Sequence, residues 1–127
     1  RIMGAVGEVR WVEEEGKIDA ITALSGSGPA YVFAFLEALQ AAGEALGFDA
    51  ATARRLAQAT AAGAVRLAQE SEEPLSRLRE NVTSKGGTTE AALARLTERG
   101  FAETVREAVF AAHARSQELA RQLGEAP

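Results

Sequence analysis

Apolar residues recur at intervals of three and four along most of the chain, the spacing that places them on one face of an α-helix. One such run begins at Pro29, whose missing N–H suits the first turn of a helix, with Ser27 or Gly28 near the cap. It stops before Gly47, where a left-handed C-cap is expected. The stripe consists of Val32, Phe35, Leu36, Leu39, Ala42 and Leu46. The pattern predicts an amphipathic helix over residues 29–46.

Four more helices are predicted downstream. Asp49 is expected to cap a helix over residues 50–69, and the stripe of that helix includes Gly63 among its leucines, which permits a close helix crossing. A proline restarts a short helix, and residues 89–99 form another that ends at a glycine. The last helix, over residues 102–123, repeats its apolar positions by alternating fours and threes, a heptad-like seam. Such a seam on a terminal helix predicts packing against a second copy of the chain.

The first residues follow a different pattern. Residues 6–12 alternate β-branched and aromatic side chains with other residues, which is typical of a half-buried strand. A lone strand leaves backbone groups unpaired, so it needs a partner in another chain or in a part of the protein that is absent. We therefore expect residues 1–17 to be a strand and linker from a missing N-terminal domain, and residues 18–127 to be one helical domain.

Composition adds an argument for self-association. Of the 59 apolar residues among the 127, 28 are alanine, which leaves 31 larger side chains. That number is small for a single thick core, so helices must approach closely through small residues or bury a face against a second chain. The expected fold is all-α, a bundle of about five helices that forms a domain-swapped dimer.

Charge and residue usage exclude several classes of protein. With no cysteine and a single histidine, no disulfide framework or structural zinc site is expected, and no metal is predicted. A net charge of −4 argues against nucleic-acid binding, which usually requires a basic patch. No apolar run approaches the length that crosses a bilayer and the start lacks a signal peptide, so we expect a soluble, cytoplasmic protein with no membrane partner.

The loop Ser84-Lys85-Gly86-Gly87-Thr88-Thr89 ahead of a helix is the strongest candidate for a binding site. Free N–H groups at a helix start favour an anion, and glycines let a ligand come close to the backbone. A carboxylate or a phosphate would fit. A plain C-cap followed by an N-cap explains the same residues, and composition does not separate the two interpretations.

Two other features have structural explanations. Ser25-Gly26-Ser27-Gly28-Pro29 matches neither the G-x-G-x-x-G dinucleotide loop nor the G-x-S-x-G hydrolase elbow, so a helix-entry turn is favoured. His113 lies within a helix among alanines, and no partner for acid–base chemistry is evident from the sequence. We interpret His113 as structural.

Two strings taken together resemble a known family: Asp19-Ala-Ile-Thr-Ala-Leu-Ser-Gly-Ser-Gly-Pro-Ala-Tyr31 and Glu80-Asn-Val-Thr-Ser-Lys-Gly-Gly-Thr-Thr89. The chain resembles the C-terminal half of pyrroline-5-carboxylate reductase, which reduces 1-pyrroline-5-carboxylate to L-proline with NAD(P)H. The resemblance implies a Rossmann domain followed by this helical domain, which interlocks with a second copy into a homodimer that often assembles into a decamer. The isolated chain is expected to bind no cofactor and to be inactive.

The resemblance also implies roles for individual residues. Thr22 is expected near the imine nitrogen of the substrate, with Glu72 as a partner of that threonine. Asn81 corresponds to a position at the nicotinamide end of the cofactor, and Glu15 to one close to the bound amino acid. The residues expected to hold the substrate, through loop N–H groups and the Thr89 hydroxyl, are Ser84, Gly86, Gly87, Thr88 and Thr89. Lys85 stands where the family usually has proline, a residue that would stiffen the loop.

One alternative of a different class remains, a helical oligomerisation module without a ligand, in which both glycine turns are only caps. A carboxylate-binding regulatory domain would share the loop, but nothing in the sequence supports it. The choice between NADH and NADPH is made by a ribose site that these residues do not contain.

Overall fold

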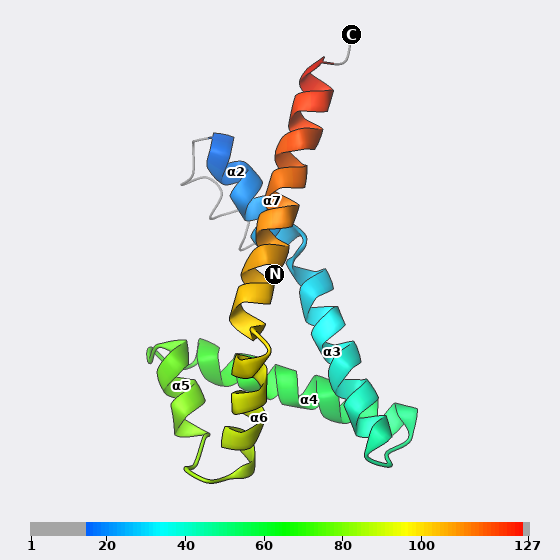
Figure 1. Cartoon of the computed structure of the whole chain (residues 1–127), viewed down its shortest axis with the longest axis vertical. Coiled ribbons are helices and arrows are strands. Elements are labelled where there is room, and N and C mark those ends of the chain that lie inside the picture. The colour runs from blue at the N-terminus through cyan, green and yellow to red at the C-terminus, as the bar shows by residue number, and fades with distance from the viewer. Residues whose placement is uncertain (1–14, 126–127) are drawn as a thin grey trace. The chain divides into compact units, whose positions relative to one another are not determined.

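The computed structural model describes residues 15–125, which are almost entirely helical (Figure 1). The all-α prediction is confirmed, whereas the predicted strand over residues 6–12 lies outside the described residues. No helix in the described part is both long and apolar enough to cross a bilayer. The elements in chain order are α2 (Glu15–Ile21), the π-helical turn η1 (Thr22–Gly26), α3 (Gly28–Ala45), α4 (Ala50–Gln69), α5 (Leu75–Asn81), α6 (Thr88–Glu98) and α7 (Phe101–Glu125).

Local signals in the sequence set the helix ends as predicted. The carboxylate of Asp49 accepts a hydrogen bond of 2.7 Å from the Thr52 N–H and caps α4. Gly47 and Gly100 have φ of 110° and 73°, the left-handed conformation that ends a helix and favours glycine. The sequence pattern predicted no helix or strand for the apolar residues 18–24. In the structure they fold as part of α2 and η1.

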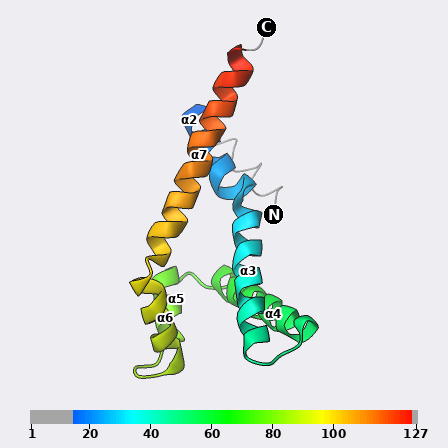
Figure 2. The same ribbon diagram turned by 45° about the vertical axis from the view of Figure 1, so that its right-hand side comes forward.

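The chain divides into two compact units. In the first unit, which takes residues up to Tyr31 and from Phe101 onward, α2 and η1 lie alongside α7 (Figures 1 and 2). The Ser116 hydroxyl on α7 donates a 2.7 Å hydrogen bond to the Asp19 carboxylate on α2. A small hollow of about 170 Å³ remains between these elements, lined by Ala20, Ala23, Val109, Phe110 and His113.

The second unit, Val32–Gly100, holds most of α3 and the whole of α4, α5 and α6. Helices α3 and α4 approach closely where Gly43 faces Ala53: a Cβ added at Gly43 would lie 3.1 Å from that of Ala53. At Gly63 an added Cβ would meet nothing within 4 Å in the described chain, so the prediction that this face of α4 permits a close crossing stays a prediction. Small residues do permit a close approach at another point of α4.

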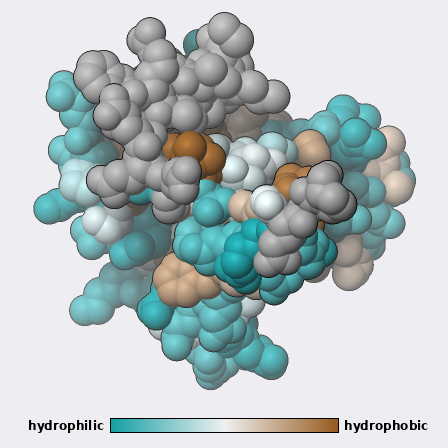
Figure 3. Space-filling view, turned by 90° about the horizontal axis from the view of Figure 1, so that it is seen from above, coloured by the Kyte–Doolittle hydropathy of each residue, from teal (hydrophilic) through white to brown (hydrophobic). Residues whose placement is uncertain are grey.

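Very little of either unit is buried. The buried hydrophobic residues of the described chain are the alanines Ala23, Ala53 and Ala57, and no large side chain is fully buried. All five phenylalanines, which are Phe33, Phe35, Phe48, Phe101 and Phe110, are between 45% and 64% exposed. Hydrophobic residues reach the surface among polar ones on the face shown in Figure 3. One copy of the chain thus lacks the core that its apolar residues could form.

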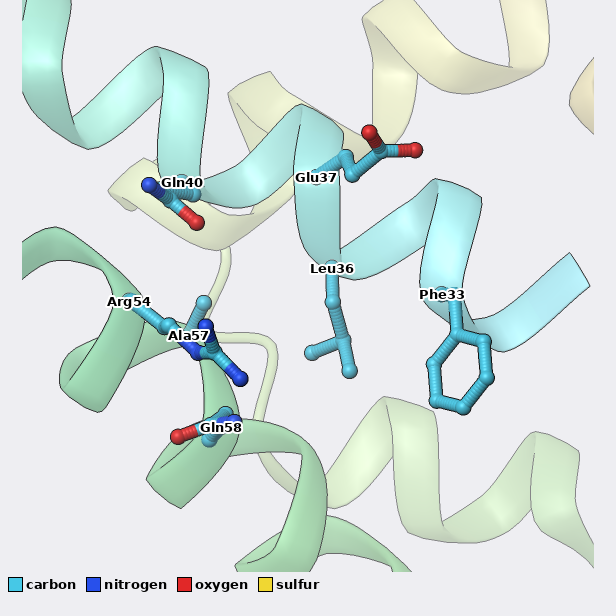
Figure 4. Close-up of a pocket in the computed structure, with 7 residues that line it drawn as sticks. All are labelled: Phe33, Leu36, Glu37, Gln40, Arg54, Ala57 and Gln58. Carbon is cyan, nitrogen blue, oxygen red and sulfur yellow. The ribbon is translucent and has the colours of Figure 1, made fainter. Parts of the chain in front are cut away.

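The crevice between α3 and α4 illustrates this (Figure 4). It measures about 360 Å³. Leu36 points into the space between the two helices and Phe33 stands beside it, both without a facing apolar residue from α4 other than Ala57. The remaining lining is polar: Glu37, Gln40, Arg54 and Gln58.

Candidate functional site

The loop between α5 and α6 forms a tight turn directly before α6. Gly86 has a φ of 76°, which favours glycine. The Gly87 N–H donates a 3.0 Å hydrogen bond to the Ser84 carbonyl, which closes the turn. The Gly86 N–H donates a 2.8 Å hydrogen bond to Oε1 of Glu90, in the first turn of α6. The expectation that these two amides are free donors is therefore not met, since the chain supplies acceptors for both.

The free donors lie one step further along the chain. Gly87 is the N-cap of α6 and provides no side-chain acceptor. The N–H groups of the next residues, Thr88, Thr89 and Glu90, donate to no acceptor within residues 15–125. Unpaired amides at the start of a helix carry the positive end of its dipole, and together they attract an anion. Amides suited to an anion thus lie at the start of α6, and the binding of an anion there stays a prediction.

Position 87 has little room for a side chain. A Cβ added there would lie 2.7 Å from the Ser84 hydroxyl oxygen and 3.2 Å from the Ser84 carbonyl oxygen. The Ser84 hydroxyl would have to rotate away and the Ser84 carbonyl would have to shift slightly. Thr89 is half-buried in the second position of the helix, whereas Thr88 is exposed.

Thr22 is the first residue of η1 in the first unit. Its hydroxyl donates a 3.0 Å hydrogen bond to the Ile18 carbonyl, and the side chain is exposed. Because the proton is used in that bond, the hydroxyl oxygen presents its lone pairs outward. In this arrangement Thr22 is a hydrogen-bond acceptor.

The other candidates are spread over the chain. Glu72 lies in the connection from α4 to α5, Asn81 ends α5, and both side chains are exposed. Glu15 is the first residue of α2, and its side chain lies outside what the structure describes. The structure brings together Ser84, Gly86, Gly87, Thr88 and Thr89. Thr22 belongs to the first unit, whereas Glu72 belongs to the second.

The sequence reasoning missed two residues at these sites. Glu90 reaches back to the amide of Gly86, the residue before the N-cap, and the signal that could have drawn attention to it is an acidic side chain in the first turn of a helix. The hydroxyl of Tyr31 donates a 2.7 Å hydrogen bond to the Ala23 carbonyl in η1. No local sequence pattern predicts that contact, because it depends on the π-helical turn η1.

An all-helical domain that leaves many large apolar side chains exposed in one copy is typical of a domain that associates with a second protein surface. Residues 15–119 match the family described as pyrroline-5-carboxylate reductase dimerisation. The chain belongs to that family, and the resemblance seen in its two motifs is confirmed.

The relatives carry the same description. The chain is 48% identical to the pyrroline-5-carboxylate reductase of Pseudomonas aeruginosa over 98% of its length and 46% of that protein. The corresponding reductase of Haemophilus influenzae is 48% identical over 93% of the chain and 44% of that protein. The chain thus spans less than half the length of the curated relatives it matches.

Solved structures agree with this assignment. A pyrroline-5-carboxylate reductase from Coxiella burnetii superimposes with a TM-score of 0.82 at 47% identity, covering 85% of this chain and 40% of that one. The pyrroline carboxylate reductase of Plasmodium falciparum, solved with NADP bound, gives a TM-score of 0.80 at 37% identity, covering 83% of this chain and 40% of that one.

Proposed function

We propose that this chain is the dimerisation and substrate-binding part of a pyrroline-5-carboxylate reductase, and that two copies interlock as a domain-swapped dimer. The observation that carries self-association is the exposure of all five phenylalanines in a chain whose buried hydrophobic residues are alanines. Burying one such side chain stabilises by about 1.5–3 kcal/mol, so covering several of these faces supports a strong interface. Light scattering of the chain at micromolar concentration should give a dimer or a larger assembly such as a decamer. A stable monomer would contradict the proposal.

The start of α6 is the proposed site for the substrate carboxylate. The free N–H groups of Thr88 and Thr89 donate to it, together with the Thr89 hydroxyl. Charge-assisted hydrogen bonds of this kind contribute about 1.5–3 kcal/mol each. Ser84 and the two glycines line the approach, and the Gly86 amide joins the donors when the Glu90 carboxylate turns away from it.

Thr22 acts at the other end of the substrate. Reduction of the cyclic imine adds a hydride to the imine carbon and leaves a proton on the nitrogen, which gives L-proline. The outward lone pairs of the Thr22 hydroxyl suit a protonated imine N–H as donor, so Thr22 orients that proton while the hydride arrives. Glu72 is the proposed partner of the threonine, and Glu15 lies close to the bound amino acid.

NAD(P)H supplies the hydride when it is bound. Among the elements of residues 15–125 there is no strand–helix–strand unit of the kind that holds a dinucleotide. The residue proposed to meet the nicotinamide end is Asn81, whose side chain is exposed. Residues 1–17 are the proposed link to a separate dinucleotide-binding domain, and 18–127 are the helical domain. The 127-residue chain alone should not oxidise NAD(P)H in the presence of 1-pyrroline-5-carboxylate.

The role of Thr89 is tested in the complete reductase that carries this domain. Thr89→Val removes the hydroxyl and keeps the shape, so the KM for 1-pyrroline-5-carboxylate should rise by about tenfold, the equivalent of one such hydrogen bond. Thr97→Val, near the other end of the same helix, is the matched control and should leave the KM unchanged. If Thr89→Val leaves the KM unchanged, the proposal that the substrate carboxylate binds at this site is wrong.

A helical oligomerisation module without a ligand is the second candidate. It is favoured by the hydrogen bonds that the Gly86 and Gly87 amides make within their own chain, as plain caps would. A bulky residue at position 87 distinguishes the two candidate functions. If the loop binds the substrate carboxylate, the bulky residue blocks that binding. If the chain is an oligomerisation module without a ligand, the bulky residue changes stability alone.

A further inference from the structure

Between α2 and α3 the backbone makes the π-helical turn η1, closed by the Ser27 N–H, which donates a 2.9 Å hydrogen bond to the Thr22 carbonyl. A π turn contains one residue more than an α-helical turn, and such turns are frequent at functional sites. Thr22 opens the turn. The direction of its side chain therefore depends on what holds η1 in place.

Tyr31, in the first turn of α3, stabilises η1 through its side chain. Its hydroxyl donates a 2.7 Å hydrogen bond to the carbonyl of Ala23, the residue after Thr22. Ala23 is completely buried, so its carbonyl lies away from solvent. A buried carbonyl without a donor is costly, so the Tyr31 hydroxyl stabilises this arrangement of the turn over others.

We propose that Tyr31 is a positioning residue for the reduction: its hydroxyl holds η1 through the Ala23 carbonyl and so fixes the Thr22 hydroxyl in the orientation that meets the substrate nitrogen. The inference rests on the function proposed for Thr22. Thr22 itself is tied to Ile18 through its own hydroxyl proton, 3.0 Å from the carbonyl oxygen. The bond to Ile18 holds the Thr22 side chain, and the bond from Tyr31 holds the backbone of the next residue, Ala23.

The first experiment is Tyr31→Phe in the complete reductase. The change keeps the ring and removes only the hydroxyl, so kcat should fall about five- to tenfold while the KM for 1-pyrroline-5-carboxylate changes little. Ser116→Ala is the matched control, because it also removes a hydroxyl that makes a 2.7 Å hydrogen bond within the same unit. It should lower the melting temperature to a similar degree and leave kcat unchanged.

A double-mutant cycle with Thr22→Val separates positioning from general support. When Thr22 lacks its hydroxyl, Tyr31→Phe should cause no further loss of kcat. An equal loss in both backgrounds, or no loss with Tyr31→Phe alone while Thr22→Val lowers kcat, overturns the role of Tyr31. If instead Thr22→Val leaves kcat unchanged, the function proposed for Thr22 is itself wrong, and that outcome is visible before Tyr31 is changed.

Discussion

Helices α4 and α6 begin in opposite ways. At α4 the N-cap is Asp49, whose carboxylate accepts the Thr52 N–H at 2.7 Å. At α6 the N-cap is Gly87, which has no side chain to offer, and the equivalent N–H of Glu90 donates to no acceptor in the described chain. The third N–H of α4 is therefore satisfied by its own cap, whereas the third N–H of α6 is left as an additional donor.

The difference indicates which helix start serves stability and which can serve a ligand. A side-chain cap satisfies one of the amides that would otherwise attract an anion, and a charged cap also places its own negative charge there. The structure adds a second element at α6: the Glu90 carboxylate, 2.8 Å from the Gly86 N–H, places a negative charge at the same end of the helix. A carboxylate bound at the proposed site would therefore meet unpaired donors and a competing carboxylate together.

The largest effect is expected when α6 is given the cap that α4 has. Gly87→Asp, combined with Ser84→Ala to make room for the new Cβ, places a carboxylate over the free amides. Binding of L-proline by the complete reductase should weaken by more than about tenfold, because at least one charge-assisted donor is lost. The melting temperature should hold or rise, because the helix gains a cap.

This opposite response of binding and stability is what a purely structural turn would not show. Ser84→Ala alone measures the cost of the accompanying change. Gly124→Ala, at a position where a Cβ meets nothing within 4 Å, controls for the loss of a glycine. Unchanged proline binding in the Gly87→Asp variant would favour the oligomerisation module.

A smaller effect is expected when the competing charge is removed. Glu90→Gln keeps an oxygen that can accept from the Gly86 N–H and removes the negative charge, so the KM should fall about two- to threefold at low salt. The gain should shrink as salt is added, since exposed charges are screened. Glu98→Gln, at the other end of α6, is the control of equal charge, and a KM that responds equally to both changes would place the carboxylate elsewhere.

The same contrast explains what could be predicted from the sequence. The Asp49 cap and the glycine at 47 follow from contacts within a few residues, and both were predicted. Free amides were predicted for the loop as a whole. In the structure they lie at Thr88 and Thr89, because Glu90 and Ser84 already accept hydrogen bonds from the two glycine amides. The η1 turn was not predictable from local pattern, since Ala23 becomes fully buried only where α7 covers it.

The unburied phenylalanines teach a related lesson. Counting alanines against larger apolar residues predicted that helices either approach closely through small residues or bury a face against a second chain. The exposure of Phe33 and Phe110, 64% and 59%, favours the second route. Which apolar faces would meet in the proposed dimer depends on two copies, and no periodicity within one chain specifies that pairing.

The smallest effect concerns acid. The Thr52 backbone N–H, and after it the Thr52 hydroxyl, hold the pKa of Asp49 below its ordinary value of 3.8. A lowered pKa means that the charged cap stabilises the folded state above pH 3.8 and that this contribution is lost as the pH falls through the lower, folded-state pKa.

Amide exchange of the 127-residue chain, corrected for intrinsic rates, should show the Thr52 N–H more protected than the Glu90 N–H at neutral pH. The gap should narrow in acid. Asp49→Asn keeps an acceptor that does not titrate, so its gap should be independent of pH. A wild-type gap equally independent of pH would mean that the charge of Asp49 plays no part in capping α4.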